Sequence, residues 1–227
     1  MVHNTKVAKR SRGRPQVRPD EETRQLIIAA ARDEFHASGY AGASMGHVAH
    51  RAGVSTKTMY RLIPTKAELF QSVVSNRISR FILEIDEEHL DALPIEEALE
   101  HILISYGTLT LDEETPATLR LVYAECERFP EIASAFFELA IRRTTQTMER
   151  WVKRQCDRGR IEIDEPSVAV GMLRGMMIME PQRALMFGQR TPPSRSEIAR
   201  RARYCASLFL DGCRPRRGHG PISRTVS

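Results

Sequence analysis

The segment Ser44–Leu62, SMGHVAHRAGVSTKTMYRL, predicts two short helices joined by a tight turn. Ser44 is placed to cap the first helix, and Met45 and Val48 have the spacing of a buried helical face. Gly53 interrupts this pattern, because glycine readily adopts the positive φ that a sharp turn needs. We therefore expect a helix–turn–helix over residues 44–62.

The second of these helices has an apolar inner face and a polar outer face. Ser55 is expected to cap it, with Met59 and Leu62 pointing inward. Cations, hydroxyls and an aromatic side chain on the outer face suit a helix that lies in a DNA groove. A solvated helical hairpin is the alternative. The residues expected to contact DNA are Ser44, His47, Ser55, Thr56, Lys57, Thr58, Tyr60 and Arg61.

A further helix is predicted to begin directly after this pair, because Thr65 and Glu68 have the spacing of a capping box. Lys66 would then lie at a helix N-terminus, where a cation and free backbone N–H groups favour phosphate. Lys66 therefore joins the expected DNA contacts.

The stretch Arg24–Phe70 resembles the DNA-binding domain of the TetR family of bacterial transcriptional regulators. The segments AAARDEF, GYAGASMGHVAHRAGVSTKTMYR and PTKAELF carry this resemblance. Family members usually have His-Phe or a similar aromatic pair after the Tyr-x dipeptide, where this chain has Leu62 and Ile63. A phosphate contact from that histidine is therefore not expected. The residues left to grip phosphate are Tyr60, Arg61 and Lys66.

Charge is distributed unevenly along the chain. Residues 1–80 hold 14 Lys and Arg against 6 Asp and Glu, which leaves 20 basic and 23 acidic residues for the remainder. This asymmetry is typical of a protein with one domain that faces nucleic acid. The composition, with 41% hydrophobic and 28% charged residues, is that of a globular protein rather than a disordered or membrane-embedded one.

Residues 1–19 are expected to form a flexible basic arm. Within it, Arg12-Gly13-Arg14-Pro15 resembles the core of an AT-hook. Arg12 and Arg14 are therefore candidates for minor-groove contact, because guanidinium groups are attracted to the potential of a narrow groove. A disordered solubilising tail is the alternative.

The four cysteines are scattered and include no CxxC pair, so we expect no metal, no disulfide framework and no cofactor. The basic N-terminus is not followed by an apolar run, and no stretch is long enough to cross a bilayer. We expect a reduced, cytoplasmic protein with no membrane partner.

We expect an all-α fold with two folded units. Residues 20–66 would form a three-helix DNA-binding domain whose first helix begins at Asp20 and ends at Gly39. A continuous helix from Lys66 would lead into residues 67–213, the expected effector-binding and dimerisation domain. Residues 214–227 read as a disordered basic tail.

The second unit reads as a series of helices. One is expected to open at Pro94, another at Pro116, and a long helix is expected over residues 132–155. Two more follow, starting near Pro166 and at the capping box of Ser194.

This half resembles the AefR-like C-terminal domain of one TetR subgroup. The resemblance lies in LVYAECERFPE, residues 121–131, and in the glycine-rich helix around Met172–Met177. Most aromatic and methionine side chains here are expected to be core, and a minority could line a cavity for a small apolar or amphipathic effector. The expected pocket residues are His101, Tyr106, Tyr123, Phe136, Met148, Trp151, Met172 and Met176.

The resemblance also implies a homodimer held by the last two helices. Two glycines spaced as G-x-x-x-G would let one helix approach another closely, and the final helix carries an apolar stripe. The expected interface residues are Gly171, Gly175, Ile198, Ala202, Cys205 and Phe209.

The sequence therefore predicts a homodimeric repressor that binds a palindromic double-stranded operator and is released by a small effector. Two alternatives stay open. Glu97, Glu100 and His101 faintly resemble half of a carboxylate metal site, which would indicate an enzyme, but no matching Glu-x-x-His is present. The other alternative is a ligand-independent architectural DNA binder.

Overall fold

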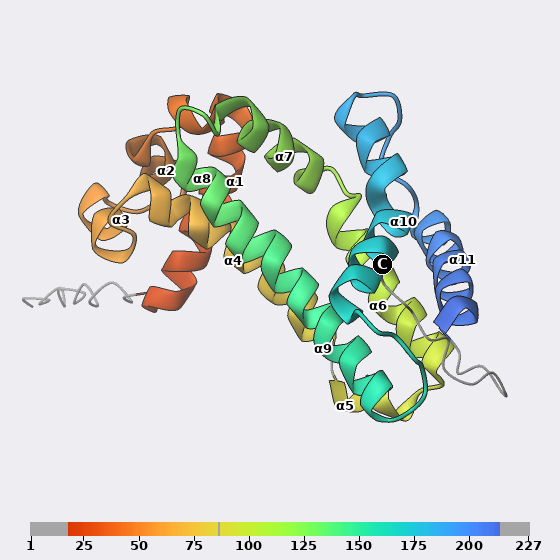
Figure 1. Cartoon of the computed structure of the whole chain (residues 1–227). Coiled ribbons are helices and arrows are strands. Elements are labelled where there is room, and N and C mark those ends of the chain that lie inside the picture. Colours follow the sequence, from red (N-terminus) through yellow and green to blue (C-terminus); the bar gives the residue numbers. More distant parts are fainter. Residues whose placement is uncertain (1–17, 86, 214–227) are drawn as a thin grey trace, which may run out of the picture.

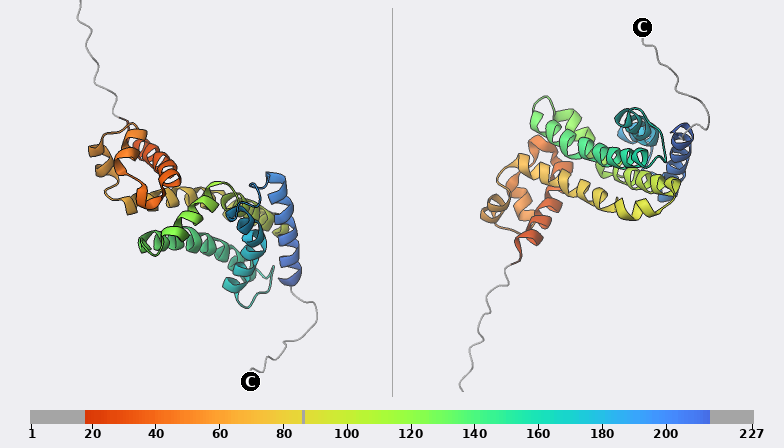
Figure 2. Two further views of the ribbon diagram at one scale, coloured as in Figure 1. Left: turned by 90° about the horizontal axis from the view of Figure 1, so that it is seen from above. Right: turned by 60° about the horizontal axis from the view of Figure 1, so that its bottom comes forward.

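The computed structural model describes residues 18–85 and 87–213 of the 227-residue chain. Over these residues the protein is helical and contains no strand, which confirms the expected all-α fold. The molecule is elongated, with α2 and α3 at one end and α11 at the other (Figure 1). Two further views show the same separation of the ends (Figure 2).

The first three helices and the start of the fourth form the predicted helix–turn–helix unit. They are α1 (Asp20–Gly42), α2 (Met45–Arg51), α3 (Thr56–Leu62) and α4 (Lys66–Glu84). Met59 and Leu62 are buried, as predicted. The Ser55 side chain accepts a bond from the Thr58 N–H at 3.0 Å, and Thr65 accepts one from the Glu68 N–H at 3.1 Å. These bonds confirm two predicted caps, whereas the Ser44 side chain makes no capping bond.

The second half begins with α5 (Glu87–Ala92) and α6 (Ile95–Thr110). The remaining elements are α7 (Glu114–Glu125), α8 (Pro130–Phe136), the π-helix η1 (Phe137–Arg142), α9 (Arg143–Asp157), α10 (Pro166–Met186) and α11 (Arg195–Cys213). The long helix expected over residues 132–155 is present, and a wider π-helical turn within it separates α8 from α9.

Helix α4 runs from the helix–turn–helix unit along α8, η1 and α9 into the second half (Figure 1). A first core joins Phe35, Tyr40 and Phe70 to Val122 and Phe136. This core therefore crosses the boundary expected between residues 66 and 67, and the helix–turn–helix unit is packed onto α7 and α8.

A second core lies between α6, α9, α10 and α11. Gly107 allows α6 to approach its neighbours closely, since a Cβ there would lie 2.6 Å from Met177 and 2.8 Å from Ile198. The apolar stripe of α11 packs into this core of its own chain. The structure therefore corrects the expected dimer interface, because these side chains are buried within one protomer: Ile198, Ala202, Cys205 and Phe209.

Candidate nucleic-acid interface and internal cavity

The outer face of α3 is open to solvent at the end of the molecule. Thr56, Lys57, Tyr60 and Arg61 are exposed, as the helical spacing predicts. Lys57 has no partner among the described residues, so its ammonium group is available to a phosphate or a base edge. This face combines a free cation with hydroxyl groups and a large aromatic side chain.

Arg61 is held by an ion pair. Its guanidinium donates two hydrogen bonds of 2.7 Å to the Asp20 carboxylate. The hydrogen bond from Arg61 is the main reason that the pKa of Asp20 lies below its usual value. A phosphate contact from Arg61 would therefore compete with Asp20, which joins the start of α1 to the end of α3.

Lys66 does not point toward a phosphate site. Its Nζ donates to the backbone carbonyls of Tyr40 at 2.8 Å, Ala41 at 3.2 Å and Ala43 at 3.2 Å. It also lies 4.9 Å from the centre of the Tyr40 ring. These contacts use the ammonium group to close the junction between α1 and α2, so a phosphate contact from Lys66 would compete with them.

The other expected contacts lie around this face. Ser55 and Thr58 hydrogen-bond each other in the cap of α3, and His47 is exposed beside the buried Glu34 carboxylate, 3.3 Å away. That carboxylate also accepts a bond from the Ser44 N–H at 3.4 Å. The arm residues Arg12 and Arg14 lie outside the described residues.

The junction between α1 and α2 is clasped by the turn between α7 and α8. The Glu125 carboxylate accepts bonds from the N–H groups of Tyr40 at 2.7 Å and Ala41 at 2.8 Å. The Tyr40 hydroxyl donates to Glu131 at 3.2 Å, and the Tyr40 ring packs against Phe129. We call these five residues the α1–α7 clasp. Burial and the neighbouring Glu131 raise the pKa of Tyr40 to about 12.

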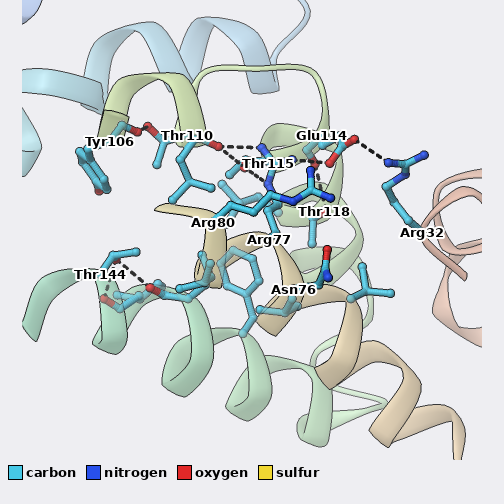
Figure 3. Close-up of a pocket in the computed structure, with 18 of the residues that line it drawn as sticks. Arg32, Asn76, Arg77, Arg80, Tyr106, Thr110, Glu114, Thr115, Thr118 and Thr144 are labelled. Carbon is cyan, nitrogen blue, oxygen red and sulfur yellow. Dashed lines mark hydrogen bonds and ion pairs between the residues drawn. The ribbon is translucent and has the colours of Figure 1, made fainter. Parts of the chain in front are cut away.

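A cavity of about 260 Å³ lies between the helix–turn–helix unit and the second half (Figure 3). Its wall takes residues from α1, α4, α6, α7, α8, η1, α9 and α10. The apolar part of the wall comprises Ile28, Ala29, Val73, Val74, Ile78, Leu109, Leu119, Phe136, Ala140, Ile141 and Ile178.

Ion pairs connect three helices at one side of this cavity. Arg77 of α4 pairs with Asp112 and Glu114 and donates to the carbonyl of Leu109 at 2.8 Å. Arg32 of α1 reaches the same Glu114 carboxylate at 3.2 Å. Figure 3 shows this network along the cavity wall. Glu114 of α7 thus holds both helices that lead to the DNA-facing end.

The π-helical turn forms part of the opposite wall. The Thr144 hydroxyl donates to the carbonyls of Ala140 at 2.7 Å and Ile141 at 3.0 Å. The Thr145 hydroxyl donates to the Ile141 carbonyl at 2.7 Å. Threonine hydroxyls commonly make such bonds to the carbonyls of the preceding helical turn.

Three of the eight expected pocket residues line this cavity: Tyr106, Tyr123 and Phe136. The other five do not. His101 is exposed on α6, Met148 and Trp151 belong to the second core, and Met172 and Met176 are exposed on α10. The expected pocket is corrected in these five positions, because the aromatic and methionine side chains there serve packing or surface.

The charged part of the cavity was not predicted, namely Arg32, Arg77, Arg80, Glu114 and Arg174. A signal existed for Arg174, which interrupts the otherwise apolar run from Met172 to Met179. A lone cation in such a run needs a polar environment, and the cavity supplies one.

An apolar face lies on α10 and α11. The side chains of Met172, Met176, Tyr204 and Leu208 are exposed there, and the last two are 67% and 68% exposed. Met176, Tyr204 and Leu208 line one shallow groove. Gly171 and Gly175 lie on the same helix, with open space where a Cβ would be. We call this the α10–α11 face.

Within residues 18–85 and 87–213, no group of three or more His, Cys, Asp and Glu side chains is arranged to hold a metal ion. The same residues include no helix with the length and hydropathy that a membrane crossing requires.

The fold and the exposed α3 define a helix–turn–helix DNA-binding protein with an internal cavity. Residues 97–212 match the family described as AefR-like transcriptional repressor, C-terminal domain. Residues 27–73 match the bacterial regulatory proteins of the tetR family. The chain therefore belongs to the TetR family, whose members are transcriptional regulators and not enzymes.

Similar proteins agree with this assignment. The regulator SrpR of Pseudomonas putida is 35% identical over 85 residues, which cover 37% of this chain and 38% of that protein. The activator FasR of Mycolicibacterium smegmatis is 33% identical over 64 residues, or 28% and 29% of the two chains. The matches thus span less than half of either relative. A solved TetR-family structure from Mesorhizobium loti is 27% identical in sequence and superposes with a TM-score of 0.76. The match covers 88% of this chain and 100% of that chain.

Proposed function

We propose that this regulator is a homodimeric repressor that binds a two-fold symmetric operator and is released by a small effector. The observation that carries the proposal is the position of the cavity. Its wall includes Arg32 of α1 and Arg77 of α4, so an occupant would touch both helices that lead to α2 and α3. Such an occupant would bind the two orientations of the DNA-facing unit with different affinity.

The clasp supports a route for this coupling. Glu114 and Glu125 stand at the two ends of α7, one at the cavity and one at the junction between α1 and α2. A shift of α7 caused by an occupant would therefore move the support of the helix–turn–helix. In the proposed mechanism, the effector stabilises an arrangement in which the two α3 helices no longer fit successive major grooves.

The α10–α11 face supports the dimer. One α3 of seven residues reads only a few base pairs, so a specific site needs two copies. Exposed Met172, Met176, Tyr204 and Leu208 form an apolar surface at the end away from α3, where pairing would leave both reading helices free. Exposed apolar patches of this kind mark association sites.

Repression is proposed because the matching C-terminal family is described as a repressor. The relative FasR is named an activator, so the sign of regulation needs its own measurement. The protein is proposed to act in the cytoplasm, on chromosomal DNA.

The test begins with the operator, which is selected from a pool of genomic fragments by the purified protein. Compounds that raise the melting temperature are then tested for release of that operator. We expect at least one compound to weaken operator binding by about 5- to 150-fold, the usual range of coupling between two sites. Equal binding of palindromic and random duplexes would instead indicate an architectural DNA binder.

The variant Glu125→Gln tests the route. It keeps the side-chain shape but removes the charge that the two N–H groups of the clasp face. We expect compound binding to stay as in the wild type while release of the operator is reduced. Glu127→Gln, a nearby exposed carboxylate outside the clasp, is the matched control.

A further inference from the structure

Arg174 lines the cavity without an acidic partner among the described residues. Its Nε donates to the Tyr106 hydroxyl at 3.0 Å, and its NH1 donates to the Thr145 hydroxyl. These bonds use two of the five N–H donors of a guanidinium group. Two cavity arginines of α1 and α4 differ from Arg174, because Arg32 and Arg77 both reach the Glu114 carboxylate. A third, Arg80 of α4, is exposed to solvent, whereas Arg174 is half-buried.

Tyr106 supplies a second donor at the same place. Its side chain is 1% exposed, and its hydroxyl oxygen accepts the bond from Arg174. Within the described part of the chain, the hydroxyl proton of Tyr106 has no acceptor. The Arg174 guanidinium also lies 5.2 Å from the centre of the Tyr106 ring, which keeps the two groups together.

A half-buried cation next to an unused O–H proton attracts a negatively charged acceptor. An anion would receive charge-assisted hydrogen bonds from Arg174 and one hydrogen bond from Tyr106. It would also replace the water contacts that the Arg174 guanidinium loses inside the cavity. Facing these donors, the wall is apolar, with Val74, Ile78 and Phe136 among its members. The site therefore has a polar end and an apolar end.

We propose that the effector is an amphipathic monoanion whose acidic group binds Arg174 and Tyr106 while its apolar body fills the space between α1, α4 and η1. The cavity volume of about 260 Å³ limits the body to a small molecule, since pockets for drug-sized ligands range from about 300 to 1,000 Å³. This inference rests on the proposed function of the cavity as the effector site.

The test uses two fluorescent probes that share an aromatic body. Anilinonaphthalene sulfonate is an anion, and N-phenylnaphthylamine is its neutral counterpart without the sulfonate. Both are titrated into the full-length protein and into Arg174→Met, Tyr106→Phe and Lys153→Met. Lys153 is an exposed cation of α9 outside the cavity, so its variant matches the change in net charge. Ala29→Trp, which adds a large side chain at the α1 wall, reports whether binding occurs in the cavity.

We expect the wild type and Lys153→Met to bind the anion at least about tenfold more tightly than the neutral probe, the effect of one charge-assisted hydrogen bond or more. Arg174→Met should abolish this preference and change binding of the neutral probe by less than about threefold. Tyr106→Phe should reduce the preference in part. Ala29→Trp should weaken binding of both probes.

Equal binding of the two probes by the wild type, with both sensitive to Ala29→Trp, would overturn the anion inference and leave the cavity as an effector site. A preference for the anion that survives in both Arg174→Met and Tyr106→Phe would also overturn it. Binding of neither probe, or binding unaffected by Ala29→Trp, would count against the cavity itself. Circular dichroism of each variant establishes whether it is folded. If Arg174→Met does not fold, Tyr106→Phe still tests the inference.

Discussion

Lys57 and Lys66 carry the same charge in different surroundings. Lys57 projects from α3 into solvent, whereas Lys66 is bonded to three backbone carbonyls at the end of α1. A free ammonium group can release counterions from DNA, but a bonded one contributes to stability. The two lysines therefore separate DNA contact from support of the helix–turn–helix.

We predict that Lys57→Ala reduces the salt dependence of operator binding, with a slope lower by about 0.9 for each phosphate that the protein no longer neutralises. Its melting temperature should stay close to that of the wild type. Lys66→Met should instead lower the free energy of unfolding by about 1–3 kcal/mol, because three carbonyls lose their donor. DNA titrations at several salt concentrations and thermal melts of both variants provide the measurement. A lower melting temperature for Lys57→Ala, with a lower salt dependence only for Lys66→Met, would contradict this prediction.

Tyr40 offers a spectroscopic report on the clasp. The pKa of its phenol is raised to about 12, chiefly by burial and by the Glu131 carboxylate. A pKa above the unfolded value of about 10 means that the protonated phenol stabilises the fold below pH 10. This contribution is lost as the pH rises from about 10 to about 12. We predict that Tyr40→Phe removes absorbance change near pH 12 from an alkaline titration of the tyrosine phenols. If the absorbance change is lost near pH 10 instead, the prediction is contradicted.

At the scale of elements, the turn between α7 and α8 fixes how α1 ends. Gly39 adopts a φ of 69°, which favours glycine, and a Cβ there would lie 2.7 Å from the Glu125 carboxylate. Gly53 adopts a similar φ of 67° but has open space around it. A side chain at either position would be strained by the positive φ, and a side chain at position 39 would also disturb the clasp.

We predict that Gly39→Ala destabilises the protein more than Gly53→Ala. The second change should cost about 1 kcal/mol for a positive φ alone. The first should cost more, because Gly39 combines its φ with a ψ of 177°, a region essentially restricted to glycine, and because the new side chain would displace Glu125 from the N–H groups of Tyr40 and Ala41. Denaturant unfolding of both variants gives the measurement, and equal losses in the free energy of unfolding would contradict the prediction.

The helix–turn–helix could be predicted from sequence because its signals are local. Ser55 and Thr65 cap the helices that follow them, and the spacing of Met59 and Leu62 defines a buried face. The direction of Lys66 could not be predicted in this way. Its partners, the carbonyls of Tyr40, Ala41 and Ala43, are more than twenty residues away and depend on how α1 packs.

The last two helices show a second limit. Helix α10 is apolar on several sides, so periodicity cannot distinguish buried Leu173 and Met177 from exposed Met172 and Met176. On α11 the predicted stripe is real, but the spacing does not say which partner covers it. In the structure that partner is α6 of the same chain. Likewise, no local signal marked the π-helical turn η1.

At the scale of the whole molecule, two neighbouring side chains of α11 serve different purposes, one in the fold of the protomer and one in the proposed association of two protomers. Phe209 is 7% exposed in the second core, whereas Leu208 is 68% exposed on the α10–α11 face. We predict that Phe209→Glu lowers the melting temperature sharply, because it buries a charge in the protomer. Leu208→Glu should keep the melting temperature of the isolated protomer but produce monomers in sedimentation. Dimers of Leu208→Glu at micromolar concentration would locate the interface elsewhere.

Gly175→Arg provides a second test of this face. A Cβ at Gly175 meets nothing within 4 Å in the protomer, so the longer side chain should be tolerated there. Across an isologous interface the same arginine would appear twice and separate the partners. We predict a folded monomer with weakened operator binding, and size-exclusion chromatography gives the readout. A variant that still elutes as a dimer would contradict the proposed pairing.

The central claim is that two copies, joined by the α10–α11 face, bind one operator through paired α3 helices. The most direct measurement is the mass of the protein–operator complex by light scattering, for the wild type and for Leu208→Glu. We predict an even number of protomers per operator for the wild type, two in the simplest case, and no stable complex for the folded Leu208→Glu monomer. A tight, specific complex of one protomer with the operator would contradict the claim.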